Sequence, residues 1–117
     1  MARTAAERFD EVATAALARL EKRWSAELAE VQVVVEDVPD LSDWDRDWVP
    51  LGRFDPAEAG LPGRVVLFRR PIQTRARGEI ALRRLVLDVL VEQVAELLGI
   101  DPEQVDPGYD NHEPDDE

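Results

Sequence analysis

The residues best suited to chemistry in this chain are three carboxylates in an otherwise apolar stretch, residues 85–98. Asp88, Glu92 and Glu96 recur every four residues, a spacing that stacks their side chains on one face of a helix, and Gln93 lies beside them. Carboxylates at this spacing repel one another by roughly 0.2–0.5 kcal/mol per pair, so they need a cation, a cleft or water around them. The pattern predicts a polar face set into the body of the protein on a helix that is otherwise buried.

Two kinds of chemistry are open to this face, which we call the carboxylate stripe (Asp88, Glu92 and Glu96). Glu92 and Glu96, with Asp88 or with Asp101 or Glu103 nearby, have the oxygen ligands that Ca²⁺, Mg²⁺ and Mn²⁺ prefer. Alternatively, carboxylates whose pKa is raised in a desolvated cleft could serve a hydrolase. The residue types alone do not decide between these alternatives.

A belt of arginines precedes the stripe and offers a third reading. Residues 64–84 hold seven of the fourteen basic residues of the chain, and only Glu79 opposes them. Such a belt could bind phosphate, but pairing with the protein's own carboxylates is the simpler account. Arg84 stands four residues before Asp88, a spacing that allows an ion pair on a helix.

Composition limits the class of protein. With 117 residues the chain is long enough for one domain with its own core, and it has no cysteine for disulfides or thiolate metal sites. A net charge of −12 argues against nucleic acid as a partner. No apolar run approaches the ~20 residues that span a bilayer, and no signal region follows Met1, so we expect a cytoplasmic protein with no membrane partner.

The first part of the chain predicts a helix and a strand. Thr4 and Glu7 have the spacing of a capping box, and apolar residues then recur every three or four positions as far as Trp24. A kink is expected between residues 22 and 25. Residues 31–36 are rich in valine and apolar on both faces, which predicts a strand in the interior of a sheet.

The middle of the chain predicts a loop and two further strands. Residues 37–48 form an acidic loop in which Trp44 and Trp48 either cover the sheet or present an interaction surface. A short strand is expected around residues 49–54. Residues 64–70 form a second clear strand, which Pro71 should close.

The last part predicts the helix that carries the stripe, followed by a tail. The helix should begin near Gly78 or Glu79 and end at Gly99 in a left-handed cap. Asp101 and Pro102 then start a short helical turn. From Asp106 onward the chain is acidic and nearly without apolar residues, so the sequence predicts one domain over residues 1–105 and a disordered tail over residues 106–117.

The order of these pieces resembles the small bacterial zincin-like metallopeptidases. The resemblance spans about residues 8–109 and rests on segments 33–39, 51–52 and 64–71 and on the Leu-Gly-Ile-Asp that ends the long helix, residues 98–101. It implies an α+β fold in which an N-terminal helix and a long motif-bearing helix pack on a small mixed sheet. In this family the long helix carries His-Glu-x-x-His-x-x-Gly-x-x-Asp, and zinc is the cofactor.

The chain departs from that motif at its chemical positions. With Gly99 as the anchor, the resemblance places Glu92 and Glu96 where the two histidine ligands stand, Gln93 at the general base and Pro102 at the aspartate. A zinc peptidase needs imidazole ligands and a carboxylate that takes a proton from bound water. The sole histidine, His112, lies in the tail. The resemblance therefore implies a degenerate member without catalytic residues and without zinc.

We interpret the chain as a non-catalytic zincin-like protein that serves as an interaction or regulatory module. The partner would be a protein of unknown identity, bound through the former cleft or through Trp44 and Trp48, and the chain would be a monomer or a weak homo-oligomer. The alternatives are a Ca²⁺, Mg²⁺ or Mn²⁺ site on Glu92 and Glu96, and a residual or different hydrolase in the same cleft.

Overall fold

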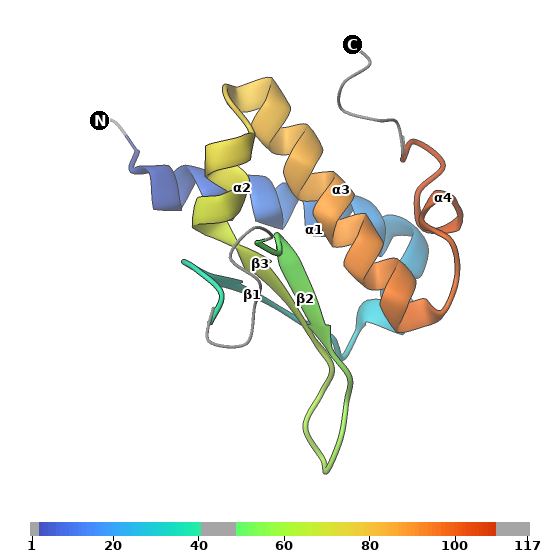
Figure 1. Ribbon diagram of the computed structural model, residues 1–117. Coiled ribbons are helices and arrows are strands. Elements are labelled where there is room, and N and C mark those ends of the chain that lie inside the picture. The colour runs from blue at the N-terminus through green and yellow to red at the C-terminus, as the bar shows by residue number, and fades with distance from the viewer. Residues whose placement is uncertain (1–2, 41–48, 110–117) are drawn as a thin grey trace.

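A computed structural model describes residues 3–40 and 49–109 as an α+β fold. Helix α3 is central: it packs against helix α1 on one side and against strands β2 and β3 on the other (Figure 1). The elements in chain order are α1 (Ala5–Leu28), β1 (Gln32–Glu36), β2 (Gly52–Asp55), β3 (Arg64–Phe68), α2 (Arg69–Arg75), α3 (Glu79–Leu98) and α4 (Pro102–Val105). This arrangement confirms the predicted fold class.

Helix α1 begins and bends where the sequence predicted. Thr4 Oγ1 accepts a hydrogen bond from the Glu7 N–H at 3.0 Å, and Glu7 Oε1 accepts one from the Thr4 N–H at 2.9 Å, which completes the capping box. Trp24 interrupts the helix with φ −121° and ψ 32°. Its indole N–H donates to the carbonyl oxygen of Val105 at 2.7 Å, so the kink connects α1 to the C-terminal part of the fold.

In the part of the chain that the structure describes, the sheet has three strands in the order β1–β3–β2, with β1 parallel and β2 antiparallel to β3. The prediction that residues 31–36 lie in the interior of the sheet is wrong, because β1 is an edge strand. Apolar residues on both faces of a strand indicate that both faces of the sheet are covered there. They do not indicate whether the strand is hydrogen-bonded to one neighbouring strand or to two. The central strand is β3, whose apolar residues are fully buried.

The segment after β3 contains a helix that the sequence analysis missed. Pro71 does not close the strand; it is the third residue of α2, where its missing N–H costs no helical hydrogen bond. Ile72 of α2 is fully buried. The helix brings the chain from the end of β3 to the start of α3, and with it several arginines of the belt.

Helix α3 has the predicted limits. It starts after Gly78, and Gly99 ends it in the left-handed conformation with φ 70°. The N–H groups of Gly99 and Ile100 both donate to the carbonyl oxygen of Ala95, at 2.8 and 3.1 Å. In α4 the Asp101 N–H donates to Gln104 Oε1 at 2.9 Å. No helix in the described ranges is long and apolar enough to cross a membrane.

The first residues of the predicted tail belong to the folded part. Asp106 is only 6% exposed, and Tyr109 packs against the core. We call Val105–Tyr109 the C-terminal strap, which starts at the last residue of α4 and lies at the red end of the chain in Figure 1. The boundary predicted at residue 105 is therefore too early. The acidic composition of residues 106–109 does not reveal the specific contacts that hold them. The rest of the predicted tail, residues 110–117, lies outside the described residues.

Candidate functional site: the carboxylate stripe and the C-terminal strap

The carboxylate stripe lies on the surface of α3. Glu92 and Glu96 are exposed and Asp88 is half-buried, so the expectation of a stripe set into the body of the protein is wrong. Most apolar residues of α3 from Leu82 onward are buried against α1 and the sheet, which turns the stripe outward. Glu92 and Glu96 are open to water, which screens the repulsion between the carboxylates without a cation.

Glu92 is nevertheless engaged by the C-terminal strap. The hydroxyl of Tyr109 donates a hydrogen bond of 2.5 Å to Glu92 Oε2. Burial of the phenol, and then this hydrogen bond to a carboxylate, raise the pKa of Tyr109 well above its ordinary value. The phenol therefore stays protonated and remains a donor across the neutral range.

Two contacts from α1 hold the other end of the strap. Arg19 donates to the carboxylate of Asp106 through Nε (2.6 Å) and Nη2 (3.1 Å). The Gly108 N–H donates to Asp106 Oδ1 at 2.9 Å, and the Trp24 indole N–H donates to the Val105 carbonyl. The Arg19 guanidinium holds the pKa of Asp106 below its usual range, against the opposing effect of burial.

Neutralising Asp106 is expected to destabilise the fold. Asp106→Asn should cost about 1–2 kcal/mol at neutral pH, because it weakens charge-assisted hydrogen bonds to a guanidinium that is itself half-exposed. A lowered pKa adds stability above the ordinary value of 3.8, and this contribution is lost as the pH falls through the folded-state pKa. Urea unfolding at a series of pH values should show the two proteins converging in acid.

The matched control for this experiment is Glu103→Gln. Glu103 is an exposed carboxylate of α4, close to the strap in the sequence, and makes no ion pair within the described residues. Its substitution should leave the unfolding free energy within about 0.5 kcal/mol of the parent. A pH-independent difference between the parent and Asp106→Asn would show that the carboxylate does not act through its charge.

Gln93 lies at the junction of α3 and β2. A Cβ atom placed on Gly52 of β2 would lie 2.8 Å from Val89 Cγ1, 3.0 Å from the Val66 carbonyl oxygen and 3.4 Å from Gln93 Cγ. Position 52 therefore admits only glycine without a shift in its neighbours, since the backbone of β2 directly abuts α3. The half-buried Gln93 packs its methylene group against this strand.

The arginine belt is divided between partners. Arg64 bonds Asp55, Arg69 bonds Asp37 and Arg83 bonds Glu79. Within the described residues, neither Glu92 nor Glu96 forms an ion pair with an arginine, so the predicted pairing with the stripe is wrong for these two. Arg84 and Asp88 line one small hollow together with Arg75.

The residues that the resemblance places at the motif positions do not fit a zinc ion. Positions 92 and 96 offer carboxylates instead of imidazoles, and Glu92 already accepts the Tyr109 hydroxyl. Pro102 is the first residue of α4 and has no ligand atom. Within residues 3–40 and 49–109, no three histidine, cysteine or acidic side chains come together in a way that could hold a metal. Trp44, Trp48 and His112 lie outside these ranges.

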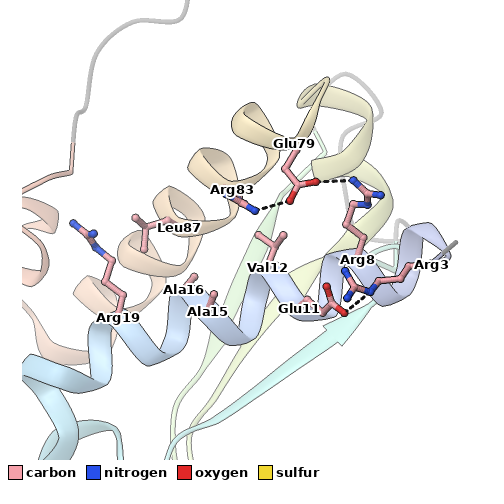
Figure 2. Close-up of a pocket in the computed structure, with 10 residues that line it drawn as sticks. All are labelled: Arg3, Arg8, Glu11, Val12, Ala15, Ala16, Arg19, Glu79, Arg83 and Leu87. Carbon is pink, nitrogen blue, oxygen red and sulfur yellow. Dashed lines mark hydrogen bonds and ion pairs between the residues drawn. The ribbon is translucent and has the colours of Figure 1, made fainter. Parts of the chain in front are cut away.

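Several hollows of the described surface lie away from Glu92 and Glu96. A groove of about 380 Å³ runs between α1 and α3, with Val12, Ala16 and Leu87 in its floor (Figure 2). Arginine–glutamate pairs form its rim: Arg3 with Glu11, and Arg8 and Arg83 with Glu79. Asp88 lines a hollow of about 210 Å³, and neither Glu92 nor Glu96 lines this hollow or the α1–α3 groove. Both side chains are exposed, which does not support the expected cleft around them.

Sequence reasoning missed Tyr109 and Asp106 as parts of the site. The available signal was Tyr109 itself, the sole tyrosine of the chain and an aromatic side chain inside an acidic segment. Aromatic side chains bury a large apolar area, so an isolated one in a polar segment indicates a docking contact. The partner on α3 could not have been identified from spacing alone.

The comparison with known families agrees with this architecture. Residues 28–111 match the family described as zincin-like metallopeptidase, a range that holds all three strands, α2, α3, α4 and the strap but only the last residue of α1. No curated protein matches the chain. The match covers well over half of the sequence and includes the whole of α3. The chain belongs to the zincin-like metallopeptidase family.

Proposed function

We propose that this protein is a zincin-like family member that does not hydrolyse peptides and that acts by binding another protein. The observation that carries the proposal is the state of Glu92. At the position of the first metal ligand stands an exposed carboxylate that is hydrogen-bonded to Tyr109. The neighbouring Gln93 has an amide in place of the general base, and an amide accepts no proton at neutral pH.

A hard-cation site on Glu92, Glu96 and Asp88 receives less support. Ca²⁺ and Mn²⁺ sites gather several oxygen ligands around one point, but the described side chains form no group of three suited to a metal. Glu96 is exposed, and Glu92 would have to leave Tyr109 to reach a cation. We therefore assign to the stripe a role in holding the strap, through the hydrogen bond between Glu92 and Tyr109.

A different hydrolase that would use Glu92 and Glu96 as catalytic carboxylates also receives little support. Acid–base catalysis by carboxylates depends on a desolvated site that raises their pKa and excludes water. Glu92 and Glu96 are exposed on the described surface, and neither lines the α1–α3 groove or the hollow at Asp88. Among the described residues, this exposure gives the two side chains little of the desolvation that such catalysis needs.

The purified protein is expected to contain no stoichiometric zinc and to leave casein and short peptides uncut. Added Ca²⁺ or Mn²⁺ should leave the melting temperature unchanged. A cation that did bind would be detected, because at a hundredfold excess over its Kd it would stabilise the fold by about 2.7 kcal/mol. Elemental analysis, a peptidase assay and thermal unfolding with each metal check these expectations.

The double variant Glu92→Gln with Glu96→Gln is the matched control. A metal-dependent rise in melting temperature that this variant abolishes would replace the proposal with a carboxylate cation site. One zinc per chain together with cleavage of casein would overturn it in favour of a peptidase whose ligands lie outside the motif positions. Equal thermal shifts in both proteins would indicate metal binding remote from the stripe.

A further inference from the structure

The positive charge of this acidic protein is concentrated at one place, where α2 meets α3. Residues 69–84 hold six arginines and one carboxylate, whereas the whole chain has a net charge of −12. Within the described residues, Arg75 and Arg77 make no ion pair, and both are exposed. We call Arg75, Arg77, Ile80 and Arg84 the basic corner.

The single carboxylate of this segment does not neutralise the corner. Glu79 Oε1 accepts from Arg8 at 2.6 Å and Glu79 Oε2 accepts from Arg83 at 2.7 Å, so both oxygens are directed to the α1–α3 groove (Figure 2). Two guanidiniums share this one carboxylate. The charges of Arg75 and Arg77 are therefore not offset by it.

The basic corner also presents apolar surface. Ile80, in the first turn of α3, is 82% exposed, the highest exposure among the large hydrophobic residues described. Ala81, the next residue of α3, lines a hollow of about 210 Å³ together with Ala76, Leu85, Arg75, Arg84 and the half-buried Asp88. An exposed aliphatic side chain and a small hollow with three apolar lining residues, next to the exposed Arg75 and Arg77, form a surface that can dock one apolar side chain flanked by acids.

We propose that the basic corner binds an acidic segment of a partner protein, through carboxylates on Arg75 and Arg77 and an apolar side chain in the hollow beside Ile80. Arginine suits this role because its guanidinium bonds a carboxylate through two parallel N–H groups. The inference rests on the proposed function, in that it names the class of partner. Electrostatic screening acts over ~8 Å, so the local charge of the corner governs docking although the whole chain is acidic.

The apolar component of the corner favours a polypeptide over other anions. Nucleic acid presents phosphates and offers no aliphatic side chain for the hollow. An acidic peptide with one leucine contains both chemical elements that the corner complements.

Fluorescence anisotropy with a labelled glutamate-rich peptide that contains one central leucine tests the proposal on the full chain. We expect saturable binding that weakens as salt is added and that is roughly tenfold weaker in the variant Arg75→Gln with Arg77→Gln. Ile80→Ser should weaken binding several-fold without loss of melting temperature, because the side chain is exposed. Both results would show that charge and apolar contact act together at the corner.

The matched control is Lys22→Gln with Arg23→Gln, which removes the same charge from the C-terminal part of α1. Equal losses in the control and corner variants, or no saturable binding, would overturn the proposal. So would binding to anionic vesicles or RNA in preference to the peptide. Binding that appears only after residues 110–117 are removed would assign the corner to the chain's own acidic end. None of these results depends on the peptidase assay, so the proposed function stands or falls separately.

Discussion

Tyr109 is expected to remain protonated in the folded protein at pH values where an ordinary tyrosine ionises. Because the chain has one tyrosine, tyrosinate absorbance in the near ultraviolet reports this residue alone. Burial and the hydrogen bond to Glu92 raise the pKa of Tyr109 above its ordinary value of 10.0. An alkaline titration should therefore show tyrosinate only as the fold opens, and a titration in denaturant should show it near pH ~10.

The same shift makes stability depend on pH. A folded-state pKa that is raised adds stability that is fully present below the unfolded-state value of 10.0 and is lost as the pH rises through the folded-state value. The parent protein should thus lose unfolding free energy above about pH 10 more steeply than Tyr109→Phe, which cannot ionise. Urea unfolding at increasing pH measures this slope.

Two glutamate variants distinguish the effect of the Tyr109–Glu92 hydrogen bond from the effect of removing one negative charge from α3. Glu92→Gln should bring tyrosinate formation to lower pH, because a neutral amide no longer favours the protonated phenol. Glu96→Gln removes the same charge one turn further along α3 and should leave the titration unchanged. A parent titration centred near pH ~10 with the native circular dichroism intact would refute the strap contact.

Gly52→Ala is expected to be the most destabilising single-methyl change in the sheet. The added Cβ would lie 2.8 Å from Val89 Cγ1 and 3.0 Å from the Val66 carbonyl oxygen, which belongs to the backbone of β3 and cannot turn away. Overpacking of this kind costs about 1–3 kcal/mol. Thermal unfolding should therefore show a fall of several degrees in melting temperature.

Gly63→Ala is the matched control, since this glycine precedes β3 and is more buried than the half-buried Gly52. Its added Cβ would lie at 3.5–3.6 Å from its neighbours, which is ordinary contact. The control should change the unfolding free energy by no more than about 0.5 kcal/mol. If both variants are equally stable, β2 and α3 are not in the close contact that places Gln93 against the sheet.

The sequence by itself determined the parts of this protein that depend on near neighbours. The capping box of Thr4 and Glu7, the kink at Trp24 and the left-handed cap at Gly99 each involve residues within one or two turns. The same holds for the chemical content of positions 92, 93, 96 and 102, which is read directly from residue types. These features were predictable because local backbone energetics fix them.

The tertiary structure alone decided what covers each face. Periodicity placed Asp88, Glu92 and Glu96 on one side of α3, but it could not tell whether that side faced a cleft or water. The strap contacts join residues far apart in the chain: Tyr109 with Glu92 across 17 positions and Arg19 with Asp106 across 87. The edge position of β1 likewise follows from pairing with β3, which strand composition does not encode. Such contacts depend on how the helices and strands pack against one another. The spacing of residues within one helix or strand does not identify which elements pack against it.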